Sequence, residues 1–336
     1  MEMSLKVFRD NYLEMLLRFL WREWSALGVA GQNSMPLRHV VDPEALLLFT
    51  CSLGRYDQRL FDEVMDWLVK NGRFLSIQRM RNILHRERFC GGAVLSAVAD
   101  WLSQHEDPAK WKLLARMGGP TDKHQALFCL PDGRPMPQLA DNDATFLNHG
   151  FLRGSVTQRG YSQTFPAGAV SCRFLGMRAL FGVNARCDVL TYLAMNGTGH
   201  PREVARELYY SQKAIHDVMT DMACSAVVQS SRGARERTFR IASDTLPFLT
   251  GAEETPGWIN WPILLSMAET VWRLTQELHT ANNGSLLETS EIMLTMKPLL
   301  ERLTRSHWAP AIRITHPQQG IEQLHAFQNT FETIAA

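Results

Sequence analysis

A polar segment near residue 212 carries side chains suited to hydrogen bonding with nucleic acid. Gln212, Lys213, His216 and Thr220 recur at a spacing that places them on the outward face of a helix, and Ser211 precedes them. Amide, ammonium and imidazole groups bond to base edges and to phosphate oxygens. The backbone N–H groups at the start of a helix also bind phosphate. The chemistry that we expect here is therefore non-covalent recognition of a duplex.

Further basic residues flank this segment on both sides. His200 and Arg202 stand at the start of the preceding helix, where a histidine would act as a helix cap or a phosphate contact rather than as a base. Three arginines gather at the tip of a hairpin that follows: Arg232, Arg235 and Arg237. A basic tip of this kind suits the DNA backbone or the narrower minor groove.

Three short helices and a hairpin must position these side chains. We expect helices over 184–195, 201–208 and 212–223, since apolar residues recur there three and four positions apart. Pro201 suits a first helical turn, and Ser211 is a good N-cap for the third helix. A short strand over 226–228 and a returning strand over 237–241 would enclose the turn at 232–235.

With its elements in this order, the segment 184–242 resembles the ArsR/MarR-like winged helix-turn-helix transcriptional regulators. The matching stretches are DVLTYLAMNG, PREVARELYYSQKAIHDVMTDMACSAVV and RGARERTFRI. Ser225 stands where such regulators usually carry Gly, and REVARELYY lacks the thiol-rich metal-sensing motif. The resemblance implies binding of double-stranded DNA, with the third helix in the major groove and the basic wing on the backbone. It does not imply metal sensing.

The charge distribution supports a local footprint on DNA. The chain holds 35 Lys and Arg against 34 Asp and Glu, which argues against non-specific coating of nucleic acid. Residues 172–242 contain ten basic and six acidic side chains, whereas residues 244–336 contain five and ten. We therefore expect the DNA contact in the central segment. A homodimer is expected, because paired units match a two-fold operator.

Signals for other functions are weak. The six cysteines form no C-x-x-C pair and no Cys/His cluster with zinc spacing, so we expect no metal and no cofactor. Phosphate-binding loops, nucleophile elbows and metalloprotease motifs are missing, so we do not expect an enzyme. Neither a secretory signal nor a membrane span is expected, which favours a cytoplasmic protein of a bacterial type. A redox or soft-metal sensor using Cys187 and Cys224 is an alternative.

The predicted fold is mainly α-helical and has four parts. These are a helical N-terminal domain (1–105), an irregular linker region (106–171), the winged helix-turn-helix (172–243) and a helical C-terminal region (244–336). The aromatic stripe over 5–27 is either domain core or a dimer-forming helix. The basic helical block over 42–89 is either a solvated face or a second helix-turn-helix that contacts nucleic acid.

Two segments outside residues 184–242 leave alternatives open. The polar stretch 153–165 could follow a DNA backbone, but we favour a bridge between domains. The C-terminal region is rich in Trp and Met, which indicates plain core or a pocket for a small-molecule effector. Two further functions also stay open. The winged helix could be a protein-interaction module, or an effector- or redox-responsive switch without constitutive DNA binding.

Overall fold

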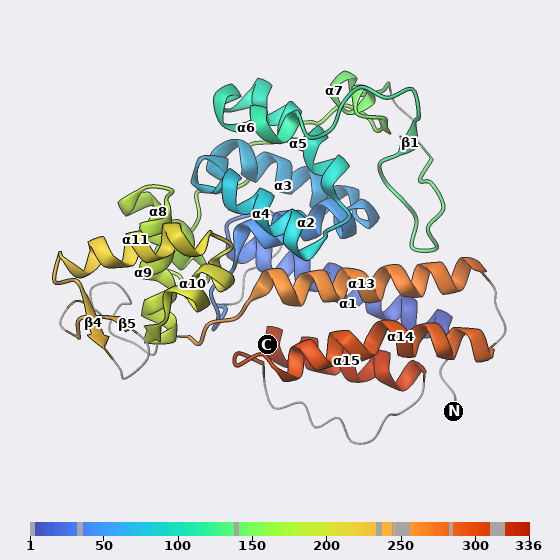
Figure 1. The fold of residues 1–336 in the computed structure, drawn as a ribbon. Helices are drawn as coiled ribbons and strands as arrows, with labels where there is room; N and C mark the ends of the chain where they lie inside the picture. The colour runs from blue at the N-terminus through green and yellow to red at the C-terminus, as the bar shows by residue number, and fades with distance from the viewer. Residues whose placement is uncertain are drawn as a thin grey trace.

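The computed structural model describes residues 4–31, 36–137, 141–232, 237–243, 245, 256–281, 285–309 and 320–336. Within this part of the chain the fold is mainly helical, as predicted, with fourteen α-helices and two small sheets of two and three strands. Figure 1 shows a large helical body and a smaller group of helices beside it, which carries the three-stranded sheet. Among the described helices, none combines the length and the apolar character that crossing a bilayer requires.

The N-terminal part is a succession of capped helices. They are α1 (Leu5–Ala26), α2 (Pro43–Leu53), α3 (Gln58–Asn71), α4 (Ile77–Glu87), α5 (Gly92–His105) and α6 (Pro108–Ala115). The side chains of Asp42, Asp57 and Ser76 cap α2, α3 and α4, and each accepts a hydrogen bond from the N–H three residues later. The single-turn 3₁₀ helices 54–56 and 72–74 link α2 to α3 and α3 towards α4.

The C-terminal helices pack on these N-terminal helices. They are α13 (Trp261–Ala281), α14 (Ser285–Thr304) and α15 (Ile321–Ala335). The ring of Phe19 on α1 lies 5.7 Å from that of Trp261 and 5.1 Å from that of Phe331, centroid to centroid. One hydrophobic cluster therefore runs through both ends of the chain. The regions 1–105 and 244–336, which we expected to be separate, share a single core.

The aromatic stripe of α1 lies inside this core. Its members are almost fully buried by neighbouring helices of the same chain: Phe8, Tyr12, Leu16, Phe19, Leu20 and Trp24. Figure 1 shows α1 behind α13, and the two helices are in contact. The suggestion that this stripe forms a dimer face is therefore wrong, because no part of it is left for a partner.

Residues 106–171 pack on the body rather than forming a separate linker. They contain β1 (Gln125–Ala126) and β2 (Phe151–Leu152), which pair in parallel, and the short helix α7 (Ala144–Asn148). The polar stretch 153–165 lies along α3. There Asp66 accepts hydrogen bonds from the N–H groups of Gly160 and Ser162, at 2.9 and 3.0 Å. This stretch therefore packs along the body.

A second hydrophobic cluster forms the smaller group. Its helices are α8 (Arg173–Phe181), α9 (Ala185–Asn196), α10 (Pro201–Leu208) and α11 (Gln212–Ala223). Its strands are β3 (Thr198–Gly199), β4 (Val228–Arg232) and β5 (Arg237–Ile241), antiparallel in the order β3-β5-β4. The register pairs Val228 with Ile241 and Arg232 with Arg237. We call residues 185–241 the central unit.

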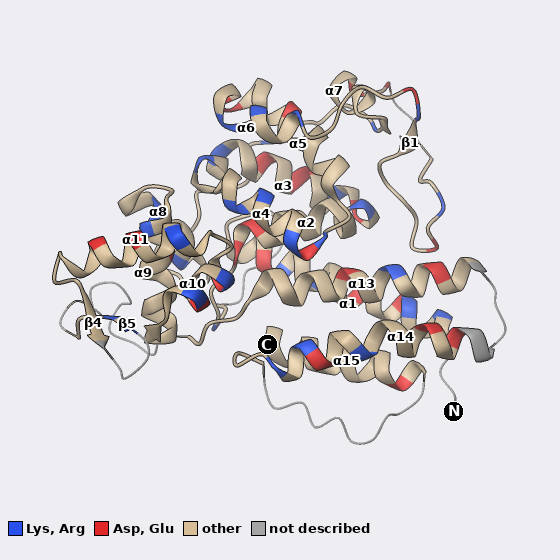
Figure 2. Cartoon of the chain, in the orientation of Figure 1, with Lys and Arg blue, Asp and Glu red and all other residues tan. Residues whose placement is uncertain are grey.

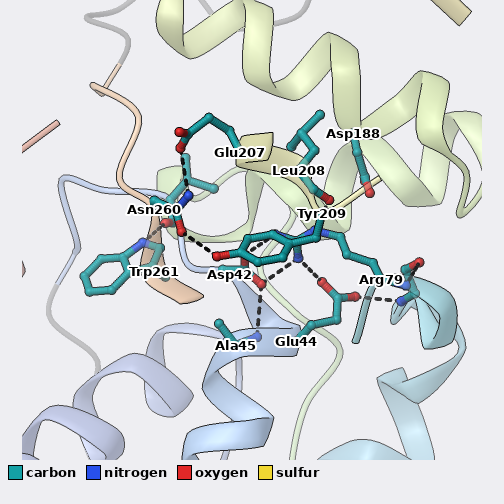
Figure 3. A network of polar contacts seen from close by, with 12 residues as sticks. Asp42, Glu44, Ala45, Arg79, Asp188, Glu207, Leu208, Tyr209, Asn260 and Trp261 are labelled. Carbon is teal, nitrogen blue, oxygen red and sulfur yellow. Dashed lines mark hydrogen bonds and ion pairs between the residues drawn. The ribbon is translucent and has the colours of Figure 1, made fainter. Parts of the chain in front are cut away.

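A buried ion-pair network, which we call the junction network, joins the body to the central unit. Its charged groups come from α2 and its cap, α4, α8 and α9, and all are at most 2% exposed: Asp42, Glu44, Arg79, Arg178 and Asp188. Figure 3 shows Arg79 pointing from α4 towards Asp42 and Glu44. It donates to Glu44 at 2.7 Å and to both oxygens of Asp42. Its Nε also donates to the Leu208 carbonyl at the end of α10, at 3.2 Å.

The second guanidinium of the junction network completes the connection to α9. Arg178 donates to both oxygens of Asp188, at 2.9 and 3.1 Å, and also to Glu44. The hydroxyl of Tyr210 donates to Asp188 at 2.8 Å. Burial alone would lower the pKa of each arginine, but the adjacent carboxylates hold the pKa above its ordinary value. Both arginines therefore remain charged.

Arg79→Met should destabilise the protein by about 3–5 kcal/mol, because it leaves buried carboxylates without a counter-charge. Urea unfolding followed by circular dichroism measures this loss. The control is Arg18→Met on α1, where the Arg18 side chain is 69% exposed and the change should stay within about 0.5 kcal/mol. A loss below about 1 kcal/mol for Arg79→Met would show that the junction network does not hold the fold together.

The stabilisation from Asp42 should depend on pH. Burial alone would raise the pKa of Asp42, but the Arg79 guanidinium lowers it below its ordinary value. A carboxyl with a lowered folded pKa stabilises above its unfolded pKa of about 3.9, and the effect is lost as the pH falls through the folded pKa. The stability difference between wild type and Asp42→Asn should therefore shrink below about pH 4. A constant difference from about pH 7 to pH 3 would contradict this assignment.

Candidate nucleic-acid interface

Helix α11 is built as the sequence predicts. The hydroxyl oxygen of Ser211 accepts a hydrogen bond from the N–H of Ala214, at 3.2 Å, and so caps the helix. Ile215, Met219 and Met222 are buried in the second cluster, with Val218 partly buried beside them. The three buried residues are four and three positions apart, so they fix one face of α11 against α9 and α10. The opposite face is left to solvent.

Three of the predicted contact residues lie together on that solvent face. Gln212, Lys213 and His216 are exposed within the first turn and a half of α11. The described residues hold no hydrogen-bond or ion-pair partner for the Gln212 and Lys213 side chains, so both groups are available to a ligand. His216 Nδ1 lies 3.6 Å from an oxygen of the exposed Asp217. The start of α11 therefore presents an amide, an ammonium and an imidazole.

Thr220 differs from this expectation. Its side chain is partly buried, and its hydroxyl oxygen is buried without a hydrogen-bond partner in the described part of the chain. The residue lies one turn further along, where the helix surface turns towards the core. We therefore correct the predicted contact set: Thr220 Oγ1 does not share the exposed face of Gln212 and Lys213.

The start of α10 adds a second polar position. His200 is the N-cap, and its Nδ1 accepts a hydrogen bond from the N–H of Arg202, at 3.2 Å. The side chain of Arg202 is exposed. His200 therefore acts as the helix cap that the sequence indicated, and Arg202 places an exposed guanidinium in the first turn of α10.

The hairpin of β4 and β5 carries exposed arginines on a buried aromatic base. Phe239 of β5 is 1% exposed, and the Arg237 guanidinium lies over its ring, 5.0 Å from the centroid. Arg237 also donates to the Ser230 hydroxyl, at 2.9 Å, and Arg240 donates to Gln229 across the strands. These contacts hold both guanidinium groups at the surface of the sheet.

The structure describes the other two predicted wing arginines only in part. Arg232 ends β4 opposite Arg237, and its backbone is described but its side chain is not. Arg235 lies outside the described residues. Arg237 is thus the wing residue whose surroundings the structure defines, with Arg240 beside it as a basic residue absent from the predicted contact set.

The charge on this surface is mixed. Figure 2 shows residues of both signs on α10 and α11. Asp217 and Asp221 are exposed on α11, and Asp221 pairs with Arg186 of α9 at 2.7 Å. The helix itself is therefore not a basic surface. The arginines of the hairpin and Arg202 supply the positive charge that a phosphate backbone would need.

Two arginines of the basic block 42–89 are partly or wholly withdrawn from solvent. Arg79, which we grouped with the basic residues of the block 42–89, is fully buried in the junction network. The Nε of Arg81 is also buried. Arg79 therefore belongs neither to a solvated face nor to a nucleic-acid contact. Arg73, Arg86 and Arg88 of the same block are exposed, so a second nucleic-acid contact by this block stays a prediction.

Cys187 and Cys224, the two thiols of the redox alternative, have different environments. Cys187 is fully buried at the start of α9, and burial raises the pKa of its thiol to about 12. Cys224 is exposed at the end of α11, and both thiols are free. A thiol reacts as the thiolate, so Cys187 is unreactive at neutral pH. Among the described residues, no group of three or more His, Cys, Asp or Glu side chains could hold a metal ion.

Comparison of the chain with protein-family models, with curated proteins and with solved structures gives no match.

Ile215→Asp should unfold the central unit, because Ile215 is fully buried and an unpaired charge there costs more than about 3 kcal/mol. The matched control is Ala214→Asp, one residue away but exposed in the first turn of α11, where an acidic side chain is tolerated. Hydrogen exchange of the amides of residues 185–241 separates the two variants. Equal protection in both would contradict the packing described for α11.

Proposed function

We propose that this protein is a sequence-specific regulator of transcription that binds double-stranded DNA through a winged helix-turn-helix of the ArsR/MarR-like kind. The observation that carries the proposal is the order of elements in the central unit. Three helices are followed by an antiparallel hairpin, and the short β3 between α9 and α10 pairs with the returning strand β5. This order supports a winged helix, in which the third helix enters the major groove.

Helix α11 would read the bases. Gln212, Lys213 and His216 stand on its free face near its N-terminus, where they can reach the edges of base pairs. An amide such as that of Gln212 can bond to adenine with two hydrogen bonds, whereas Lys213 donates to guanine or to a phosphate. The N–H groups of the first turn, next to Ser211, would hold a phosphate through the positive end of the helix dipole.

The hairpin and the start of α10 would hold the backbone. Arg237 and Arg240 are exposed on β5 and Arg202 is exposed on α10, so elements before and after α11 in the chain carry basic groups. In this proposal Arg232 and Arg235 belong to the same wing. Because Asp217 and Asp221 reduce the charge of α11, these flanking arginines would provide most of the salt-dependent affinity.

The proposal includes a homodimer that acts in the cytoplasm. One unit of this size reads a half-site, and a two-fold dimer reads two half-sites about one helical turn apart. Since the α1 stripe is buried, the dimer contact would lie elsewhere on the surface. Light scattering during size-exclusion chromatography measures the assembly. A protein that remains monomeric on DNA would overturn this part of the proposal.

A protein-interaction module is the second candidate, and two observations favour it. Asp217 and Asp221 are exposed on the same helix as the proposed contact residues. Three apolar residues are exposed just before α9: Leu180, Phe181 and Val183. A winged helix that docks on another protein would carry such a surface.

Binding of the purified protein to its own upstream DNA, in a salt series beside a scrambled duplex, separates the two candidates. We expect affinity that depends on sequence and falls as salt increases, since each neutralised phosphate releases counterions. Absence of binding at low salt by the folded protein would favour the interaction module.

Two substitutions should affect DNA binding differently. Arg237→Ala removes a phosphate contact, so it should weaken binding to every duplex and lower the slope of affinity against salt by about one unit. Gln212→Ala removes a base contact, so it should reduce the preference for the upstream site by about 1–3 kcal/mol. Arg18→Ala, on the exposed side of α1, is the control. If both test variants weaken all duplexes equally, the two roles are wrongly assigned.

A further inference from the structure

A cavity of about 660 Å³ lies where the central unit meets the body. On one side it is lined by Arg206 of α10 and by Tyr209, in the turn between α10 and α11. On the other side it is lined by Arg86 of α4 and by Arg302 and Arg305 at the end of α14 and just beyond it. Its volume is in the range of sites that hold small molecules. Any ligand in it would touch both the proposed DNA-binding unit and the body.

Two of the three carboxylates that line this cavity are buried and already have donors. Glu87 accepts from the Tyr209 hydroxyl at 2.7 Å and pairs with Arg302 at 2.8 Å. Glu207 accepts from Asn260 at 2.7 Å, as Figure 3 shows, and from the indole N–H of Trp258 at 3.1 Å. Both side chains are less than 5% exposed. A cationic ligand would have to displace these buried contacts.

The guanidinium groups of the cavity retain free capacity to donate. Arg86 lies over the Tyr209 ring, 4.5 Å from its centroid, and its other contact is a 3.3 Å hydrogen bond to the carbonyl of Arg206. Within the described residues Arg86 has no carboxylate partner. Arg206 pairs with Glu207 at 3.0 Å and Arg305 with Glu301 at 3.4 Å, but these arginine side chains are 61% and 80% exposed, so each keeps N–H groups that face solvent. The cavity therefore offers charged donors that a ligand could use.

We propose that this cavity binds a small organic anion that regulates the protein, with its phosphate or carboxylate group held by the arginines. Guanidinium groups match the geometry of both anions and bind them with paired hydrogen bonds. Tyr209, Ile263 and Trp308 provide an apolar wall for the rest of the molecule. The regulatory part of this inference rests on the proposed DNA-binding function, whereas the binding of the anion does not.

Tyr209 provides the coupling between the cavity and α11. It caps the C-terminus of α10 with a left-handed backbone, φ 64°, and leads directly into the turn before Ser211. Its hydroxyl contacts Glu87 of the body and Asn260, which precedes α13. An anion that draws Arg86 and Arg206 together would change the position of Tyr209 against the body. The orientation of α11 would therefore differ between the free and the bound protein, which is what regulation of affinity requires.

Isothermal titration calorimetry of the full chain tests the site without DNA. The probes are AMP and citrate, with adenosine as the uncharged counterpart of AMP, each at up to about 1 mM. We expect AMP or citrate to bind and adenosine not to bind. Arg86→Ala and Arg305→Ala should each weaken binding at least about tenfold, whereas Arg18→Ala should leave it unchanged. Both arginines are exposed, so these variants should fold.

Three results would overturn the proposed site. They are absence of binding by both anions, adenosine binding as tightly as AMP, and unchanged anion binding by both arginine variants. DNA affinity with and without the bound anion then tests regulation, for which we expect a change of about 5- to 150-fold. An unchanged DNA affinity would overturn the regulation only. If the protein binds the anion but no DNA, the proposed anion site is supported and the proposed DNA-binding function is overturned.

Discussion

The burial of Arg79 and Arg178 between three carboxylates is the interaction on which the arrangement of this protein depends. Transfer of these charges out of water costs several kcal/mol per ion, and only close, well-directed contacts repay that cost. The charged groups of the junction network come from the helices of both hydrophobic clusters. All of its contacts can therefore form only when the two clusters hold one position relative to each other. The carbonyl of Leu208, at the end of α10, and the hydroxyl of Tyr210, in the turn before α11, belong to the same network. The position of α11 is therefore set from within the body.

Local signals predicted most of the helices and strand β5, whereas long-range contacts could not be predicted from the sequence. The first wing strand was predicted over 226–228, but β4 covers Val228–Arg232. Helix α11 and strand β5 begin and end where caps and apolar periodicity indicated. Strand β3 was missed because it has two residues and exists only through pairing with β5, some forty residues later. Arg79 was assigned to a solvated or DNA-binding face, since nothing local shows that the N-terminus of α2 lies beside it.

The candidate interface also contains residues that the sequence predicted and residues that it did not. The exposure of Gln212, Lys213 and His216 follows from helical periodicity, and the structure places them together. Thr220 follows the same periodicity, but its hydroxyl oxygen is buried. That burial comes from neighbouring elements outside the helix, so periodicity could not predict it. The cavity beside Tyr209 left no sequence signal, because its arginines come from α4, α10 and the end of α14. Because α11 carries acidic residues, α11 would provide the specificity for bases, and the hairpin and the start of α10 would provide the electrostatic affinity.

Site-specific photo-cross-linking to DNA tests the central claim most directly. A photoreactive side chain at position 212 would lie at the start of α11, and one at position 294 would lie on the body, where Leu294 is 74% exposed. With the upstream duplex bound, we predict cross-links from position 212 to bases of the site and none from position 294. Cross-links from position 294 alone, or none from position 212 while DNA is bound, would contradict the assignment of α11 as the helix that reads DNA.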